Sequence, residues 1–114
     1  MQHDVRKLCF DILRAIADIR SFTNGLSLDE YRNDRLVKLA VERGYEIIGE
    51  ALRRMEIRFA SEFQNITDGR KIIDFRNLLI HGYDDVADEI VWSITTNNIQ
   101  ILESEIQNIL RKQQ

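Results

Sequence analysis

The sequence contains no proline and only five glycines in 114 residues. Proline interrupts a helix because it lacks the backbone N–H and its ring clashes with the preceding turn. Its absence leaves long helices possible, and glycine becomes the main helix breaker. Gly25, Gly69 and Gly82 fall where the spacing of apolar residues breaks, so we expect a turn at each of them.

The single cysteine, Cys9, excludes a disulfide within the chain, and one thiol with two distant histidines does not fit a zinc site. We therefore expect no metal, and we expect Cys9 to be a small core residue. No apolar run approaches the roughly 18 residues of a membrane span, and the N-terminal residues lack the apolar stretch of a signal peptide. The sequence predicts a cytosolic protein with no membrane contact.

The composition is that of an ordinary globular domain, with 44% hydrophobic and 31% charged residues. A disordered chain would have fewer apolar groups to bury. The net charge of −3 argues against a broad attraction to nucleic acid, but the 16 lysines and arginines leave room for a local basic site. The length predicts one domain, residues 1–114.

Apolar residues recur at three- and four-residue spacing along four segments, which predicts four main helices. The first begins at Asp4 as its N-cap and continues beyond Ile19. The second begins at a capping box of Ser27 and Glu30 and runs to about Phe63, with a break near residues 33–34. Its expected core stripe consists of Leu36, Ala40, Gly44, Ile47, Ile48, Ala51, Met55 and Phe59.

The third helix is expected over Arg70 to Ile80, and the last over Glu89 to Leu110 with a break near Ser93. No segment sustains the alternation of a strand. The fold class predicted is therefore all-α, an antiparallel bundle of four main helices with room for a short extra helix.

The predicted second helix contains two glycines and several charged residues in its interior. Gly44 and Gly49 each cost about 1 kcal/mol relative to alanine, which predicts that another backbone packs closely there. At 100° per residue, Arg43, Glu50 and Arg54 lie together on one flank of the stripe. They form either a solvated flank with pairs such as Glu50–Arg54, or a polar seam beside a site.

The usual catalytic signatures, such as a Gly-rich phosphate loop, G-x-S-x-G, H-E-x-x-H and C-x-x-C, are missing. The remaining candidate is RNLLIHGY, Arg76 to Tyr83. On a continuous helix His81 would point about 140° away from Arg76, so the two converge only where the helix ends. Gly82 would end it by adopting the left-handed conformation of a C-terminal cap. We expect a site built at a helix end.

Arginine and histidine are a minimal set for cleaving RNA without a metal. The 2′-hydroxyl attacks the adjacent phosphate, histidine takes or gives a proton, and arginine holds the oxyanion by two hydrogen bonds. The reaction needs both a base and an acid, and the other histidine, His3, lies at the opposite end of the sequence. A two-fold dimer that brings two copies of His81 and Arg76 together would supply both.

A structural interpretation of the same stretch competes with the catalytic one. The dipole of a helix favours a histidine in its last turn, an arginine stem covers apolar surface, and a tyrosine near a helix end packs its ring. In that case the stretch only stabilises the fold.

RNLLIHGY matches the R-x4-H-x-Y motif of HEPN domains, α-helical domains that include many RNases. The segments RLVKLAVERGYEIIGEAL, IIDFRNLLIHGYDDV and VWSI resemble the HepT-like branch, the toxin half of type VII HepT–MntA toxin–antitoxin pairs. The resemblance covers nearly the whole chain in length and helix order.

The resemblance implies an endoribonuclease that cleaves tRNA or mRNA at the cleft of a homodimer, without a cofactor. Arg76 and His81 would be catalytic, with Asn77 and the glutamate of "GEA", Glu50, as supporting residues. Glu50 would orient Arg76 or an equivalent basic group, a hypothesis that Glu50→Gln tests. A partner antitoxin, an MntA-like nucleotidyltransferase, would transfer AMP from ATP to Tyr83. The added phosphate and adenosine would block the entry of RNA.

Two other functions compete with the nuclease. One is a non-catalytic HEPN module that binds a nucleotidyltransferase, and the other is a structural helical dimer. The intact motif favours the nuclease, because a retired active site has no chemical need for both Arg76 and His81.

Overall fold

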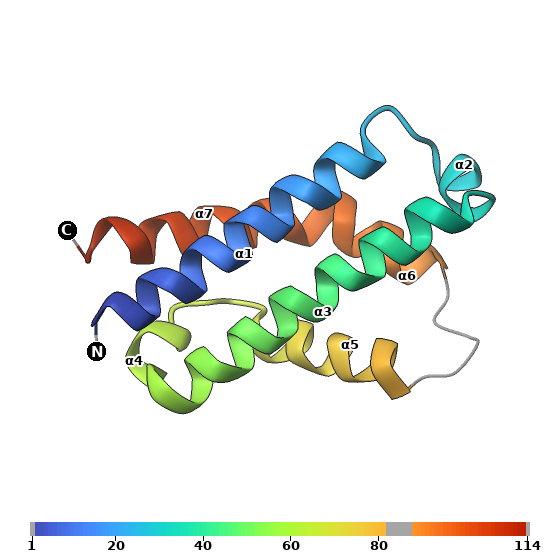
Figure 1. Cartoon of the computed structure of the whole chain (residues 1–114). Coiled ribbons are helices and arrows are strands. Elements are labelled where there is room, and N and C mark those ends of the chain that lie inside the picture. The colour runs from blue at the N-terminus through green and yellow to red at the C-terminus, as the bar shows by residue number, and fades with distance from the viewer. Residues whose placement is uncertain (1, 82–87, 114) are drawn as a thin grey trace.

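The computed structural model describes residues 2–81 and 88–113, with side chains from Val5 onward. Four main helices, α1 (Gln2–Thr23), α3 (Arg35–Arg58), α5 (Gly69–His81) and α7 (Ile99–Arg111), lie side by side, each antiparallel to the next (Figure 1). No strand occurs in the two described ranges, which confirms the predicted all-α bundle. None of the described helices is long and apolar enough to cross a membrane.

Helices α1 and α3 occupy the middle of the packing, because they pack against each other, while α5 packs against α3 and α7 packs against α1. Arg20 on α1 donates to Glu103 on α7 at 2.6 Å. Glu105 on α7 accepts from the backbone N and the hydroxyl of Thr67, just before α5. The largest fully buried side chains come from all four main helices and from α2, and include Ile12, Ile16, Tyr31, Tyr45, Ile48, Leu52, Ile73 and Ile106.

Short helices join the main ones. They are α2 (Leu28–Arg32), α4 (Ala60–Phe63), α6 (Asp88–Ser93) and a π-helical turn, η1 (Ile94–Asn98), that leads into α7. The predicted break near residues 33–34 is confirmed. Near Ser93 the α-helix changes to the π-helical turn η1, but the backbone stays helical, so the helix is altered there rather than broken. At the first break the Asp34 carboxylate accepts from the backbone N of Val37 and caps α3.

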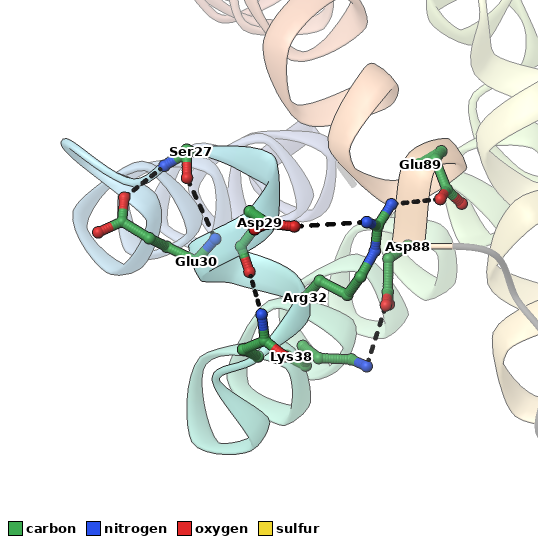
Figure 2. A network of polar contacts seen from close by, with 8 residues as sticks. Ser27, Asp29, Glu30, Arg32, Lys38, Asp88 and Glu89 are labelled. Atoms are coloured by element: carbon green, nitrogen blue, oxygen red, sulfur yellow. Dashed lines mark hydrogen bonds and ion pairs between the residues drawn. The ribbon is translucent and has the colours of Figure 1, made fainter.

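Ion pairs connect α2 and the start of α3 with α6 (Figure 2). Arg32 pairs with Glu89 and also lies near Asp29. Lys38 on α3 pairs with Asp88 at 3.1 Å. These contacts hold the first residues of α6 against the end of the bundle where the second helical region begins.

The predicted capping box at the start of α2 is confirmed. The Ser27 hydroxyl accepts from the backbone N of Glu30 at 3.1 Å, and the Glu30 carboxylate accepts from the backbone N of Ser27 at 2.9 Å. We expect Ser27→Ala to lower the free energy of unfolding by about 1 kcal/mol, because the first turn loses a hydrogen-bond acceptor. Urea denaturation followed by circular dichroism measures this, and an unchanged midpoint would show that the cap contributes nothing.

Two predicted helix ends are wrong. Helix α1 already begins at Gln2, so Asp4 lies inside it rather than at its N-cap. The second region does not run unbroken to Phe63, because Phe59 leaves the helical conformation at φ −137° and α4 follows. The half-buried Phe59 ring packs against the core at this bend.

The predicted core stripe of α3 is only partly correct. Gly44, Ile48, Ala51 and Met55 are buried, but Leu36 is 78% exposed. Ile47 is also exposed. The core face also uses Val41, Tyr45 and Leu52, which the stripe omitted. Apolar residues cover more than one face of α3, since the helix packs against α1 and α5, and so periodicity alone misplaced the centre of the buried face.

Candidate functional site

Arg76 lies on the partly buried face of α5. It follows the buried Phe75 and stands one helical turn after the buried Ile72, so its stem is drawn into the packing between α5 and α3. Its side chain is 22% exposed. The Nη1 atom donates to Asn77 Oδ1 at 2.9 Å, and Nη2 donates to Glu50 Oε1 at 3.2 Å. The structure thus brings together three of the predicted site residues.

Glu50 on α3 has a second partner. Its Oε2 atom accepts from Arg54 Nε at 3.2 Å, as expected for residues four apart on a helix. One carboxylate therefore holds an arginine of its own helix and an arginine of α5. Arg43 pairs instead with Glu46, also at 3.2 Å.

A cavity of about 330 Å³ opens between α1, α3 and α5. The predicted seam of Arg43, Glu50 and Arg54 borders it, together with Arg76, so the seam is both paired and adjacent to a cavity. The remaining lining comes from α1, α3 and α5 and consists of Leu8, Asp11, Glu46, Ile47, Ala51 and Ile80. Arginine side chains at the wall of a cavity can bind a phosphate by bidentate hydrogen bonds.

The structure does not bring His81 to Arg76. Helix α5 stays helical through His81, so the two side chains leave it about 140° apart. His81 is exposed, and the cavity lining contributed by the described residues does not include it. Gly82, the predicted helix end, and Tyr83 lie outside the described residues.

Other titratable groups are buried for structural reasons. Burial raises the pKa of the Cys9 thiol to about 11, which keeps it protonated and excludes it as a nucleophile, and Cys9 is the core residue predicted. The buried Tyr45 and Thr95 hydroxyls share a hydrogen bond of 2.6 Å. Burial raises the pKa of Tyr45 well above its usual range. None of these groups lines the cavity beside Arg76.

The sequence did not reveal which side chains pack against the two glycines of α3. A Cβ atom at Gly44 would meet the side chain of Ile19, and one at Gly49 would meet the side chain of Arg76. The close approach predicted there is real, but side chains make it rather than another backbone. Asp11 was also missed as a lining residue. No signal in the sequence identifies these partners, because they depend on the register between helices.

The fold and the cavity define an all-helical protein with an arginine held between two helices. The family described as "Ribonuclease HepT-like" matches residues 12–109. The chain belongs to the HepT-like ribonuclease family. The family predicted from the sequence is thereby confirmed.

Relatives of the chain carry names that agree with this family. "Putative RNase MJ1380" of Methanocaldococcus jannaschii is 30% identical over 93% of this chain and 96% of its own. "Putative RNase MJ0127" of the same organism is 33% identical over 95% and 88%. "Probable ribonuclease HepT" of Thermococcus cleftensis is 29% identical over 87% and 89%. No solved structure gives a significant match.

Proposed function

We propose that the protein is an endoribonuclease that cleaves tRNA or mRNA without a metal ion. The observation that carries this proposal is Arg76, which Glu50 and Asn77 hold at the wall of a cavity in a chain of a ribonuclease family. A guanidinium with part of its surface exposed is suited to bind a phosphate that gains negative charge during reaction.

The 2′-hydroxyl of a ribose attacks the adjacent phosphorus, and its proton passes to a base. The bond from phosphorus to the 5′-oxygen of the next nucleotide breaks, and that oxygen takes a proton from an acid. Arg76 stabilises the charge on the phosphoryl oxygens, and His81 moves a proton. The products are a 2′,3′-cyclic phosphate and a 5′-hydroxyl.

A homodimer completes this site. His81 leaves α5 about 140° away from Arg76, so one copy alone does not present both groups to one phosphate by helix geometry. Two copies related by a two-fold axis, with their motifs facing across a cleft, supply a second histidine and a second arginine. The acid and the base then come from the two copies of His81.

The proposed nuclease is the toxin of a HepT–MntA pair. An MntA-like nucleotidyltransferase transfers AMP from ATP to the hydroxyl of Tyr83. The bond between the α- and β-phosphates of ATP breaks, the tyrosine loses its proton, and pyrophosphate leaves. The added negative charge and the adenosine, two residues from His81, repel and obstruct an RNA phosphate.

The second candidate function is a non-catalytic module that binds such a nucleotidyltransferase. The divergence of Arg76 and His81 along α5 favours it. In that case the arginines at the cavity bind the partner rather than RNA.

Purified protein incubated with tRNA and with mRNA in excess EDTA separates the two candidates. The nuclease yields fragments with 2′,3′-cyclic phosphate ends, and its specific activity falls when dilution dissociates the dimer. The module yields no fragments at any protein concentration and binds a nucleotidyltransferase tightly. Cleavage that stops when EDTA is added would overturn the metal-independent mechanism.

A further inference from the structure

The stem of Arg76 occupies the space that a side chain at residue 49 would need. A Cβ atom at Gly49 would lie 2.2 Å from Arg76 Cβ and 2.4 Å from its Cγ, well below the 3.0 Å that real Cβ atoms keep. Glycine destabilises a helix interior relative to alanine, so its presence in the middle of α3 calls for a packing reason. The close approach of α5 at Arg76 supplies that reason.

Two hydrogen bonds, one from each Nη atom, hold the guanidinium of Arg76. Asn77 on the same helix accepts from Nη1, and Glu50 on α3 accepts from Nη2. The Nε atom is buried and has no hydrogen-bond partner among the described residues, so the two Nη contacts fix the orientation. The side chain is 22% exposed and lines the cavity.

Glu50 is itself held in place. Its second oxygen accepts from Arg54, one turn further along α3. The neighbouring pair of Arg43 and Glu46 lines the same cavity with a similar geometry, but Glu46 has no hydrogen bond or ion pair to Arg76. The two glutamates are therefore matched in helix, cavity and charge, and they differ in their contact with Arg76.

We propose that Gly49 and Glu50 form a cradle that positions Arg76 for its reaction with RNA. Gly49 admits the stem, and Glu50 sets the plane of the guanidinium. This inference rests on the proposed nuclease function. Glu50 acts through Arg76 and does not touch the substrate, so it is a positioning residue.

Two possible roles of Glu50, one through its charge and one through positioning Arg76, predict opposite effects of Glu50→Gln. If Glu50 acted only through its charge, its removal would make the cavity more positive, strengthen RNA binding and leave the chemical step unharmed. As a positioning residue, its replacement by glutamine leaves one acceptor oxygen for two arginines, so the guanidinium is held less firmly and is misplaced in the transition state. A misplacement of about 1 Å can cost up to about 10²-fold in rate.

The first test compares steady-state cleavage by Glu50→Gln and Glu46→Gln. The cradle predicts that Glu50→Gln lowers kcat by about 10-fold to 10²-fold without raising KM. Glu46→Gln removes the same charge from the same cavity, so its KM can change, but it keeps kcat within about twofold of the parent because Glu46 does not contact Arg76. An unchanged kcat in Glu50→Gln, or an equal loss in both variants, overturns the cradle.

The second test uses the two glycines of α3. Gly44→Ala and Gly49→Ala both introduce a Cβ clash, with Ile19 at 2.7 Å and with Arg76 at 2.2 Å. At a temperature where circular dichroism shows both variants folded, Gly49→Ala should lose kcat and Gly44→Ala should keep it. Equal kcat values overturn the role of Gly49. If Gly49→Ala does not fold, Glu50→Gln decides alone.

A measurement independent of cleavage separates the cradle from the nuclease. The ¹⁵N side-chain signals of Arg76 report rotation about the Nε–Cζ bond, which the contacts with Asn77 and Glu50 should slow. Glu50→Gln should speed this rotation, and Glu46→Gln should leave it unchanged. Absence of RNA cleavage by the parent refutes the proposed function, whereas identical Arg76 signals in Glu50→Gln and the parent refute the cradle.

Discussion

Arg76→Ala is expected to lower the rate of RNA cleavage by about 10²-fold to 10³-fold, the usual effect of removing one group that stabilises a developing oxyanion. The loss should appear mainly in kcat, because the guanidinium binds the charge that grows in the transition state. Arg76→Lys should recover little of it, since a lysine keeps the charge but lacks the planar fork that spans two oxygens. Single-turnover cleavage in EDTA measures both.

Arg70→Ala is the matched control for Arg76→Ala. Arg70 lies on the same helix but is exposed, pairs with Glu56 and Asp74, and does not line the cavity. Its removal should change cleavage by less than about twofold, as the loss of an exposed pair does. The proposal fails if Arg76→Ala cleaves as fast as the parent while circular dichroism shows it folded.

Much of the fold follows from local patterns in the sequence. The capping box of Ser27 and Glu30 determines where α2 begins, and it can be read from the sequence because the two residues are only three positions apart. The core face of α3 is less predictable, because apolar residues such as Leu36 remain exposed on a helix that packs on two neighbours. The spacing of apolar residues predicts that a helix forms, whereas its buried face depends on which other helices pack against it.

The site divides in the same way. Arg76 and Asn77 are neighbours in the sequence, and the grouping of Arg43, Glu50 and Arg54 follows from helical arithmetic. The contact between residues 50 and 76 does not follow from helical arithmetic, since it depends on the register between α5 and α3. Family resemblance marked Glu50 and Arg76 as site residues and led to the hypothesis that Glu50 orients Arg76 or an equivalent basic group, and the folded chain shows the hydrogen bond between them.

His81→Ala is expected to reduce cleavage by about 10²-fold to 10⁴-fold, the range for losing a general acid or base. Its effect on stability should be small, within about 0.5 kcal/mol, because the residue is exposed at the end of α5. The catalytic and structural interpretations of the motif therefore separate sharply. A structural histidine would show the reverse, a lower midpoint of thermal unfolding and unchanged chemistry.

The chain provides its own control for this variant. His3→Ala removes the other histidine, which lies at the opposite end of the sequence, and should leave cleavage unchanged. Mixing the parent with an excess of His81→Ala then probes the dimer, because most parent chains then pair with the variant. If both copies of His81 serve one phosphate, as acid and as base, mixed dimers lose activity together with the variant. If each chain worked alone, the activity of the mixture would equal the sum of its parts, and the proposed dimer mechanism would be wrong.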